Sequence, residues 1–83
     1  METEIGKVTE FFAKPVVAGI QLSQVLKVGE KIHIKGHTTD MSITVDSMQI
    51  NRVNITEAKP GDVIGIKVPD RVRNGDTVYK VTE

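Results

Sequence analysis

The two histidines of the chain, His33 and His37, lie four residues apart, and Asp40 follows in the same stretch. On a helix this spacing would bring two imidazoles together as metal ligands. Here Gly36 separates them, and His33 falls in a segment with the alternation of a strand, so nothing in the sequence forces the rings to converge. We interpret both as surface histidines, and a weak metal site with Asp40 is the alternative.

Other kinds of chemistry lack the residues that they need. The chain has no cysteine, which excludes a thiol nucleophile and a zinc–cysteine site. Gly6-Lys7 is followed by Val8, whereas a phosphate-binding loop needs Ser or Thr there. Ser42 and Ser47 have no histidine placed beside them as a base. We therefore predict that the chain is not an enzyme and has no catalytic residues, no metal, no cofactor and no bound nucleotide.

A row of basic side chains is the strongest candidate for a contact surface. Lys31, His33 and Lys35 occupy alternate positions of one segment and so share a face of a strand. Lys27 lies in the adjoining turn, and Arg73 lies in the last loop. Such a row could contact RNA phosphates or a protein partner. The alternative is a solvated face whose lysines protect an edge strand from aggregation.

Composition sets the fold class in which these residues are held. The chain has 83 residues, among them 12 Val, 9 Ile and 8 Thr but 2 Leu and 3 Ala. Branched side chains of this kind favour strands over helices, and the length fits one domain. The formal net charge is 0, which removes the overall field that drives nonspecific binding to nucleic acids or membranes. No signal peptide and no apolar run near the roughly 20 residues that span a bilayer are visible, so we expect a cytoplasmic protein without membrane contact.

Alternation places the strands along the chain. Ile20, Ile32, Ile34, Ile43, Val45, Ile64 and Ile66 are predicted to be buried. The predicted strands are Ile5–Phe12, Val16–Leu22, Lys31–Lys35, Met41–Ile50, Val63–Val68 and Asp76–Val81, with a short edge piece at Val53–Ile55. The first two strands should form a hairpin across the break at Ala13-Lys14-Pro15, and a phase change predicts a β-bulge near Asp46-Ser47. Six strands without helices would leave open edges exposed, so we predict a small closed six-stranded β-barrel.

Turn residues separate these strands. Pro60 fixes φ, Gly61 supplies positive φ, and Asp62 can bond nearby backbone. Gly29 serves a tight reversal before residue 31 in the same way, and Gly36 opens a polar loop. Gly75 belongs to the charged loop that precedes the last strand. We therefore assign structural turn roles to Gly29, Gly36, Pro60, Gly61, Asp62 and Gly75.

Several stretches, in the same order, resemble the second domain of elongation factor Tu. They are Leu26-Lys27-Val28-Gly29-Glu30, Ile32-His33-Ile34-Lys35-Gly36, Val45–Gln49, Ala58–Gly65 and Val72–Val78. The resemblance covers roughly residues 5–81 and implies the translation-factor type of β-barrel, as in small stand-alone elongation-factor-like proteins. Gln49 and Val63 stand where the family has the glutamate and asparagine that lie by the aminoacyl end of tRNA, which argues against aminoacyl-tRNA delivery.

The resemblance implies a non-catalytic binding module associated with translation, with ribosomal RNA, tRNA or a protein as partner. A similar barrel also resembles the C-terminal module of some collagenase-type peptidases. The alternative function is therefore an accessory subunit that docks on such an enzyme when the enzyme lacks its own module. We expect residues 1–83 to form a single domain that is a monomer in isolation, with residues 1–4 as a flexible N-terminal segment.

Overall fold

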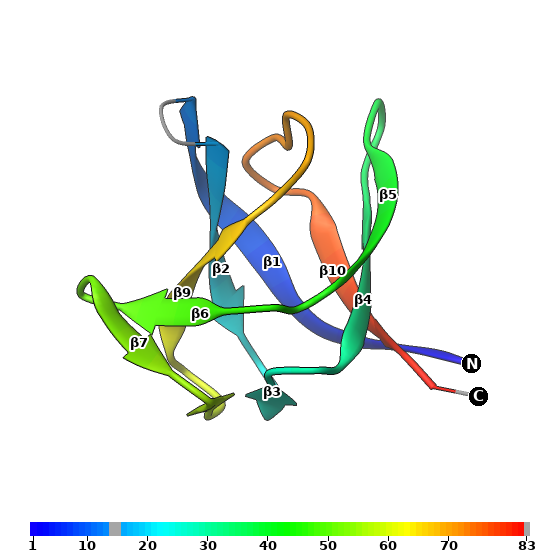
Figure 1. Cartoon of the computed structure of the whole chain (residues 1–83). Coiled ribbons are helices and arrows are strands. Elements are labelled where there is room, and N and C mark those ends of the chain that lie inside the picture. The colour runs from blue at the N-terminus through cyan, green and yellow to red at the C-terminus, as the bar shows by residue number, and fades with distance from the viewer. Residues whose placement is uncertain (14–15, 83) are drawn as a thin grey trace.

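The structure, a computed structural model, describes residues 1–13 and 16–82 and contains strands but no helix in these ranges. The prediction of an all-β fold is confirmed. Within the same residues there is consequently no helix long and apolar enough to cross a membrane. The strands are β1 (Glu2–Ala13), β2 (Val16–Leu22), β3 (Leu26–Lys27), β4 (Lys31–Lys35), β5 (Asp40–Thr44), β6 (Met48–Ile50), β7 (Val53–Ile55), β8 (Glu57–Ala58), β9 (Val63–Lys67) and β10 (Thr77–Val81) (Figure 1).

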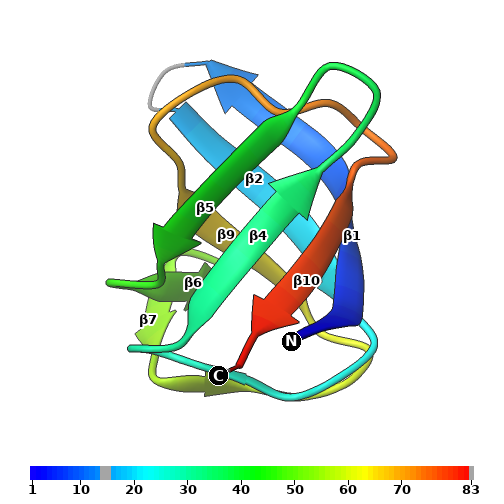
Figure 2. The same ribbon diagram turned by 90° about the vertical axis from the view of Figure 1, so that its right-hand side faces the viewer.

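Eight strands form one antiparallel sheet in the order β5-β4-β10-β1-β2-β9-β6-β7, and β3 pairs with β8 in a second, two-stranded sheet. Figure 2 shows β5, β4 and β10 crossing in front of β2 and β9, so that the large sheet curls over on itself. Its edge strands, β5 and β7, do not pair with each other. The predicted closed six-stranded β-barrel is therefore wrong, because the sheet is open.

The sheet stays open because the chain turns away after β5. Residues 45–47 belong to no strand, and β6 then pairs with β9 at a single position, Gln49 opposite Gly65. We predicted one strand over Met41–Ile50 with a bulge near Asp46-Ser47. The irregularity lies at the predicted place, but it is a break between two strands and not a bulge within one. The strand is broken there, and the two halves pair with different neighbours. The register shifts lie in β1 instead, between Glu4 and Gly6 and between Val8 and Glu10.

The first hairpin and the closing strand hold the two ends of the chain together. β1 and β2 pair as predicted, from Gly6 opposite Leu22 to Ala13 opposite Val16. Of the predicted break between them, Lys14-Pro15 lies outside the described residues. Residues 2–4, which we expected to be flexible, belong to β1 and pair with β10. Beyond them, the amide of Thr82 donates to the carbonyl of Met1 at 2.7 Å.

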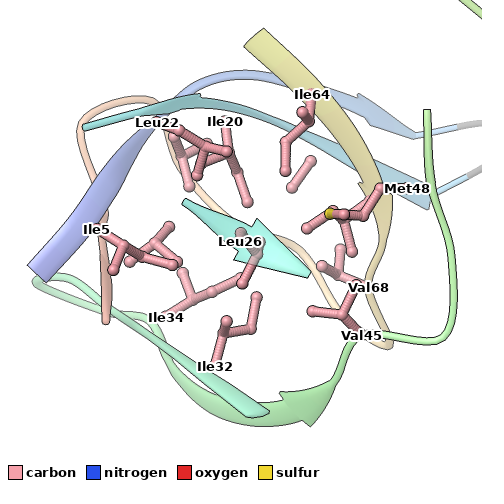
Figure 3. Packing of buried hydrophobic residues seen from close by; sticks show 14 of the residues in the cluster. Ile5, Ile20, Leu22, Leu26, Ile32, Ile34, Val45, Met48, Ile64 and Val68 are labelled. Atoms are coloured by element: carbon pink, nitrogen blue, oxygen red, sulfur yellow. The ribbon is translucent and has the colours of Figure 1, made fainter. Parts of the chain in front are cut away.

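The core fills the space inside the curled sheet (Figure 3). Ile20, Ile32, Ile34, Val45, Ile64 and Ile66 are buried as predicted, each at most 2% exposed. Ile43 is only half-buried, because it lies on the edge strand β5, where no further strand covers it. Burial of these branched side chains at alternate positions is what makes the curled sheet stable.

Close approaches and positive φ angles account for the glycines at the turns. Gly29, Gly61 and Gly75 have φ values of 96°, 92° and 95°, which side chains rarely adopt. Gly36 is required for another reason, since a Cβ there would overlap the carboxylate of Asp76. That buried carboxylate accepts a hydrogen bond from the amide of Arg73 at 2.9 Å, so it cannot move away freely.

Candidate functional site

The structure brings three of the five candidate basic residues together. Lys31, His33 and Lys35 point to the outer face of β4, because Ile32 and Ile34 between them are buried. Lys27 lies on β3, in the separate two-stranded sheet. Arg73 lies in the loop before β10. The five residues therefore do not form one continuous row.

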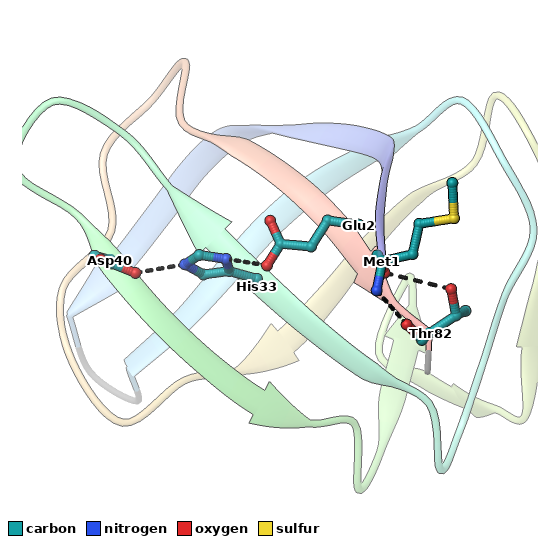
Figure 4. A network of polar contacts seen from close by, with 5 residues as sticks. All are labelled: Met1, Glu2, His33, Asp40 and Thr82. Carbon is teal, nitrogen blue, oxygen red and sulfur yellow. Dashed lines mark hydrogen bonds and ion pairs between the residues drawn. The ribbon is translucent and has the colours of Figure 1, made fainter.

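His33 is held between two carboxylates, and no pattern in the sequence predicted the one of Glu2 (Figure 4). Its Nδ1 lies 2.6 Å from Oε2 of Glu2 on β1, and its Nε2 contacts Oδ1 of Asp40 on β5. Tyr79 of β10 lies beside the imidazole, with 6.4 Å between ring centroids. We call Glu2, His33 and Asp40 the histidine clamp. It joins β1 and β5 to β4, although Glu2 lies 31 positions before His33 in the sequence.

Protonation of His33 suits this geometry. A neutral imidazole has one N–H, whereas the imidazolium has two and can donate to both carboxylates. The hydrogen bond to Asp40, followed by the one to Glu2, raises the pKa of His33 above its ordinary value of 6.5, and these effects outweigh the partial burial of the ring. The clamp therefore favours the charged histidine.

Carboxylates also balance the charge of the face around β4. Asp40 and Glu2 lie beside His33, and Oε2 of Glu30 lies 3.1 Å from Nζ of Lys80.

His37 is exposed in the loop between β4 and β5. In the part of the chain that the structure describes, no three His, Cys, Asp or Glu residues are grouped so that they could hold a metal ion.

A second feature is a hollow on the outer face of the sheet, with a volume of about 360 Å³. We call it the glycine trough. Its lining residues are Glu10, Phe12, Gly19, Gln49, Asn51, Arg52, Val63, Ile64 and Gly65. The cross-strand register explains why it is concave: Gly19 on β2 lies opposite Gly65 on β9, and neither has a side chain to fill the outer face.

The walls of the glycine trough carry both apolar and charged groups. Phe12 is 52% exposed and Val63 is 53% exposed, which is unusual for side chains of this size in a chain whose other apolar residues are mostly buried. Glu10 and Arg52 add opposite charges. Exposed apolar side chains gathered around a hollow are typical of a surface that binds another molecule.

The hairpin of β6 and β7 places Arg52 at the trough in a strained backbone conformation. Ile50 pairs with Val53, so Asn51 and Arg52 form a two-residue turn, and their φ values are 51° and 65°. Turns with two positive φ angles match the twist of a hairpin but favour Asn followed by Gly. An arginine in this position costs stability, and such strain is often found where a side chain serves function.

Part of the glycine trough could have been found from the sequence. A glycine inside a strand pattern, as at Gly65, indicates a close approach or a bend, and the resemblance singles out Gln49 and Val63. No pattern in the sequence sets the register of β2 against β9, so the pairing of Gly19 with Gly65 could not be predicted.

Comparisons with known proteins connect this fold to peptidases. The chain is 44% identical over 81 residues to the uncharacterized protease MJ0090 of Methanocaldococcus jannaschii. The match covers 96% of this chain but 20% of that protein, so the chain spans about a fifth of its relative's length. No protein-family model matches the chain.

Solved structures with the same fold come from a peptidase as well. Two crystal structures of the C-terminal domain of a Geobacillus thermoleovorans protein assigned as a U32 peptidase, one of them a selenomethionine variant, have TM-scores of 0.87 and 0.88. Both cover 94% of this chain, and they cover 91% and 99% of the respective domain, at 14% sequence identity. At this identity the likeness establishes the fold.

These findings correct the resemblance to the second domain of elongation factor Tu. The relative is a protease and the structural neighbours are peptidase domains, so the prediction of a translation-associated, RNA-binding protein is wrong. The motifs behind it consist largely of turn residues such as Gly29, Gly61 and Gly75. Any small antiparallel domain with reversals at these places needs such residues, so they say little about function.

Proposed function

We propose that the chain is a non-catalytic accessory module of a protease-type enzyme, in agreement with the alternative drawn from the sequence. The observation that carries the proposal is the match of 96% of the chain to one fifth of a protease. The fold supports it, because the C-terminal domain of a protein assigned as a U32 peptidase has the same architecture. Most of such a polypeptide lies outside the part that resembles this chain, and the chemistry of proteolysis belongs there.

We expect the module to dock on the remaining part of the protease through the glycine trough. The apolar side chains of Phe12 and Val63 are the large exposed groups of this surface. Burying them against a partner would be favourable by about 25 cal/mol for each Å² removed from water. Glu10 and Arg52 at the rim would fix the orientation by pairing with opposite charges.

Binding to the relative tests the proposal directly. The ligand is the M. jannaschii protease from which the 81 matched residues have been deleted, and isothermal titration calorimetry measures its affinity for this chain. We expect saturable binding. The double substitution Phe12→Asp and Val63→Asp should weaken it by at least about tenfold, since a central apolar contact at an interface is worth more than about 1 kcal/mol.

Val28 provides the matched control, because it is 37% exposed and lies outside the glycine trough. Val28→Asp should leave the affinity unchanged. Circular dichroism must show that the deleted protease and the variants are folded. Absence of binding at about 100 μM with folded partners would contradict the proposal, and so would hydrolysis of a peptide substrate by this chain alone.

A further inference from the structure

The open side of the sheet contains a cleft of about 460 Å³. On one wall lies the edge strand β5 with Ile43 and Thr44, and on the other lies the end of β9 with Lys67, Val68 and Pro69. We call this cleft the seam. It lies between the outer edge of β5 and the end of β9 beyond Gly65, the residue at which β9 pairs with β6.

The hydrogen bonds of β5 show which backbone groups face the seam. The amide of Val45 donates to the carbonyl of Glu30 at 2.9 Å, so Val45 bonds on the β4 side. In antiparallel pairs the bonding direction alternates from residue to residue. Ile43 and Met41 therefore also bond to β4, and the N–H and C=O groups of Ser42 and Thr44 point to the open edge.

The end of β9 offers a second set of groups to the same cleft. The amide of Val68 donates to the carbonyl of Val16 at 3.2 Å, so Val68 bonds on the β2 side. By the same alternation, the N–H and C=O of Lys67 point away from β2. Two residues earlier, Gly65 uses this direction to pair with Gln49 of β6. In the described residues no strand occupies the corresponding place beside Lys67.

The inner lining of the seam is apolar. Ile43 is half-buried and packs against the core, and Val68 is 7% exposed. The outer rim carries Asp46 and Lys67, one charge of each sign. An occupant that fits must present main-chain donors and acceptors at strand spacing, an apolar side chain toward Ile43, and side chains of opposite charge toward the rim.

We propose that the seam binds an extended segment of a partner polypeptide as an added strand beside β5. An extended main chain is the ligand whose donors and acceptors repeat at the spacing of Ser42 and Thr44. A second copy of this chain, pairing β5 with β5, would use the edge strand but leave Lys67 of the opposite wall without a partner. The inference concerns a surface separate from the glycine trough and does not depend on the peptidase relationship.

Linear twelve-residue peptides displayed on phage are the probe. Selection against the folded chain should enrich segments with apolar residues at alternate positions. In NMR spectra, a selected peptide should shift the amide signals of Ser42, Thr44 and Lys67 and slow their hydrogen exchange by at least about tenfold, as new backbone hydrogen bonds do. The amides of Ile43 and Val45, which face the β4 side and not the open edge, should change little in exchange.

Two sets of variants separate strand addition from other contacts. Peptides N-methylated at the residues that bond to β5 should lose binding, whereas methylation at the intervening residues should preserve it. Thr44→Pro removes an N–H that faces the open edge, where proline is tolerated in a strand, and it should abolish binding. Thr44→Val keeps the N–H and should bind like the wild type.

Several results would overturn the proposal. They are a selection that enriches no peptide, selected peptides whose shifts avoid β5 and β9, and equal binding of both N-methylated sets. The N-methylated peptides act on the wild-type chain, so they decide the question even if Thr44→Pro does not fold. A concentration-dependent dimer in sedimentation equilibrium that protects Ser42 and Thr44 without any peptide would assign the seam to a second copy instead.

Discussion

Replacement of His33 by glutamine should make the chain less stable in mildly acidic solution and leave it nearly unchanged in alkaline solution. The substitution removes the charge that the histidine clamp favours but retains a polar side chain of similar length. The pKa of His33 is raised in the folded chain by the contacts with Asp40 and Glu2. A group with a raised folded pKa stabilises fully at pH values below its unfolded pKa, about 6.5, and this contribution is lost as the pH rises through the folded value.

The size of the effect follows from the exposure of the clamp. The side chain of His33 is 15% exposed, but those of Glu2 and Asp40 are 41% and 75% exposed. Solvent therefore screens both contacts, and exposed ion pairs of this kind contribute about 0–1 kcal/mol each. We expect about 1 kcal/mol for the two together. In a domain of this size such a change shifts Tm by about 4–8 °C.

Thermal unfolding followed by circular dichroism between pH about 5.5 and about 9 measures the difference in Tm between wild type and His33→Gln. The difference should be largest at the acidic end and approach zero at the alkaline end. Asp40→Asn should reduce this pH dependence more than Glu2→Gln, because the contact with Asp40 is the larger cause of the raised pKa. His37→Gln, at an exposed loop position, is the control. A difference in Tm that stays constant over the whole pH range would refute the reasoning.

Three further predictions concern backbone geometry, and urea unfolding checks each of them. Gly6→Ala should destabilise the chain by about 1–3 kcal/mol, because a Cβ there would lie 2.5 Å from the carbonyl oxygen of Gln21; Gly65→Ala, whose Cβ would meet its nearest neighbour at 3.4 Å, should cost clearly less, and equal losses would contradict this. Arg52→Gly should stabilise the β6–β7 turn by about 0.5–1 kcal/mol, and a loss of stability would show that the side chain of Arg52 contributes to the fold. Gly61→Val should cost about 1–3 kcal/mol because φ is 92°, and an unchanged unfolding midpoint would argue against the turn geometry.

The sequence predicted local structure well where alternation was regular. β4 covers Lys31–Lys35, the predicted range, and β2 covers Val16–Leu22. Val53–Ile55 is β7, at an edge of the large sheet, as predicted. In these segments the choice of inner and outer face follows from the period of two residues, which a single sequence displays directly.

The sequence could not predict which edges meet. A change of alternation near Asp46 is compatible with a bulge in one strand and with a break between two strands, since both restore the buried face. Whether the sheet closes into a barrel also depends on how β6 pairs with β9. That pairing joins Gln49 to Gly65, sixteen positions apart in the sequence. Such nonlocal pairing leaves no mark in the local pattern, so the closed barrel was an assumption about edges rather than a property of the strands.

The histidine clamp could not be predicted in full either, because part of it also depends on nonlocal strand pairing. His33 and Asp40 are seven residues apart on neighbouring strands, and their hairpin could have suggested the contact. Glu2 is separated from His33 by 31 positions. The two side chains meet across the face of β10, the strand that lies between β1 and β4. The expected basic row therefore became a site of balanced charge once the sheet order placed carboxylates beside it.

The comparisons with peptidases concern the fold, whereas the geometry of the sheet concerns the surfaces that could bind a partner. The fold is retained at 14% identity with a TM-score of 0.87, because a core of this kind requires only branched apolar residues at alternate positions. Core residues such as Ile32 and Ile64 thus carry little information about partners. The glycine trough needs Gly19 and Gly65 in register, and the seam needs the outer edge of β5 to stay without a neighbouring strand, neither of which the core demands. The glycine trough includes the paired residues Gln49 and Gly65, and the seam is lined by β9 from Lys67 onward. These two surfaces are therefore where binding specificity can change while the fold stays the same.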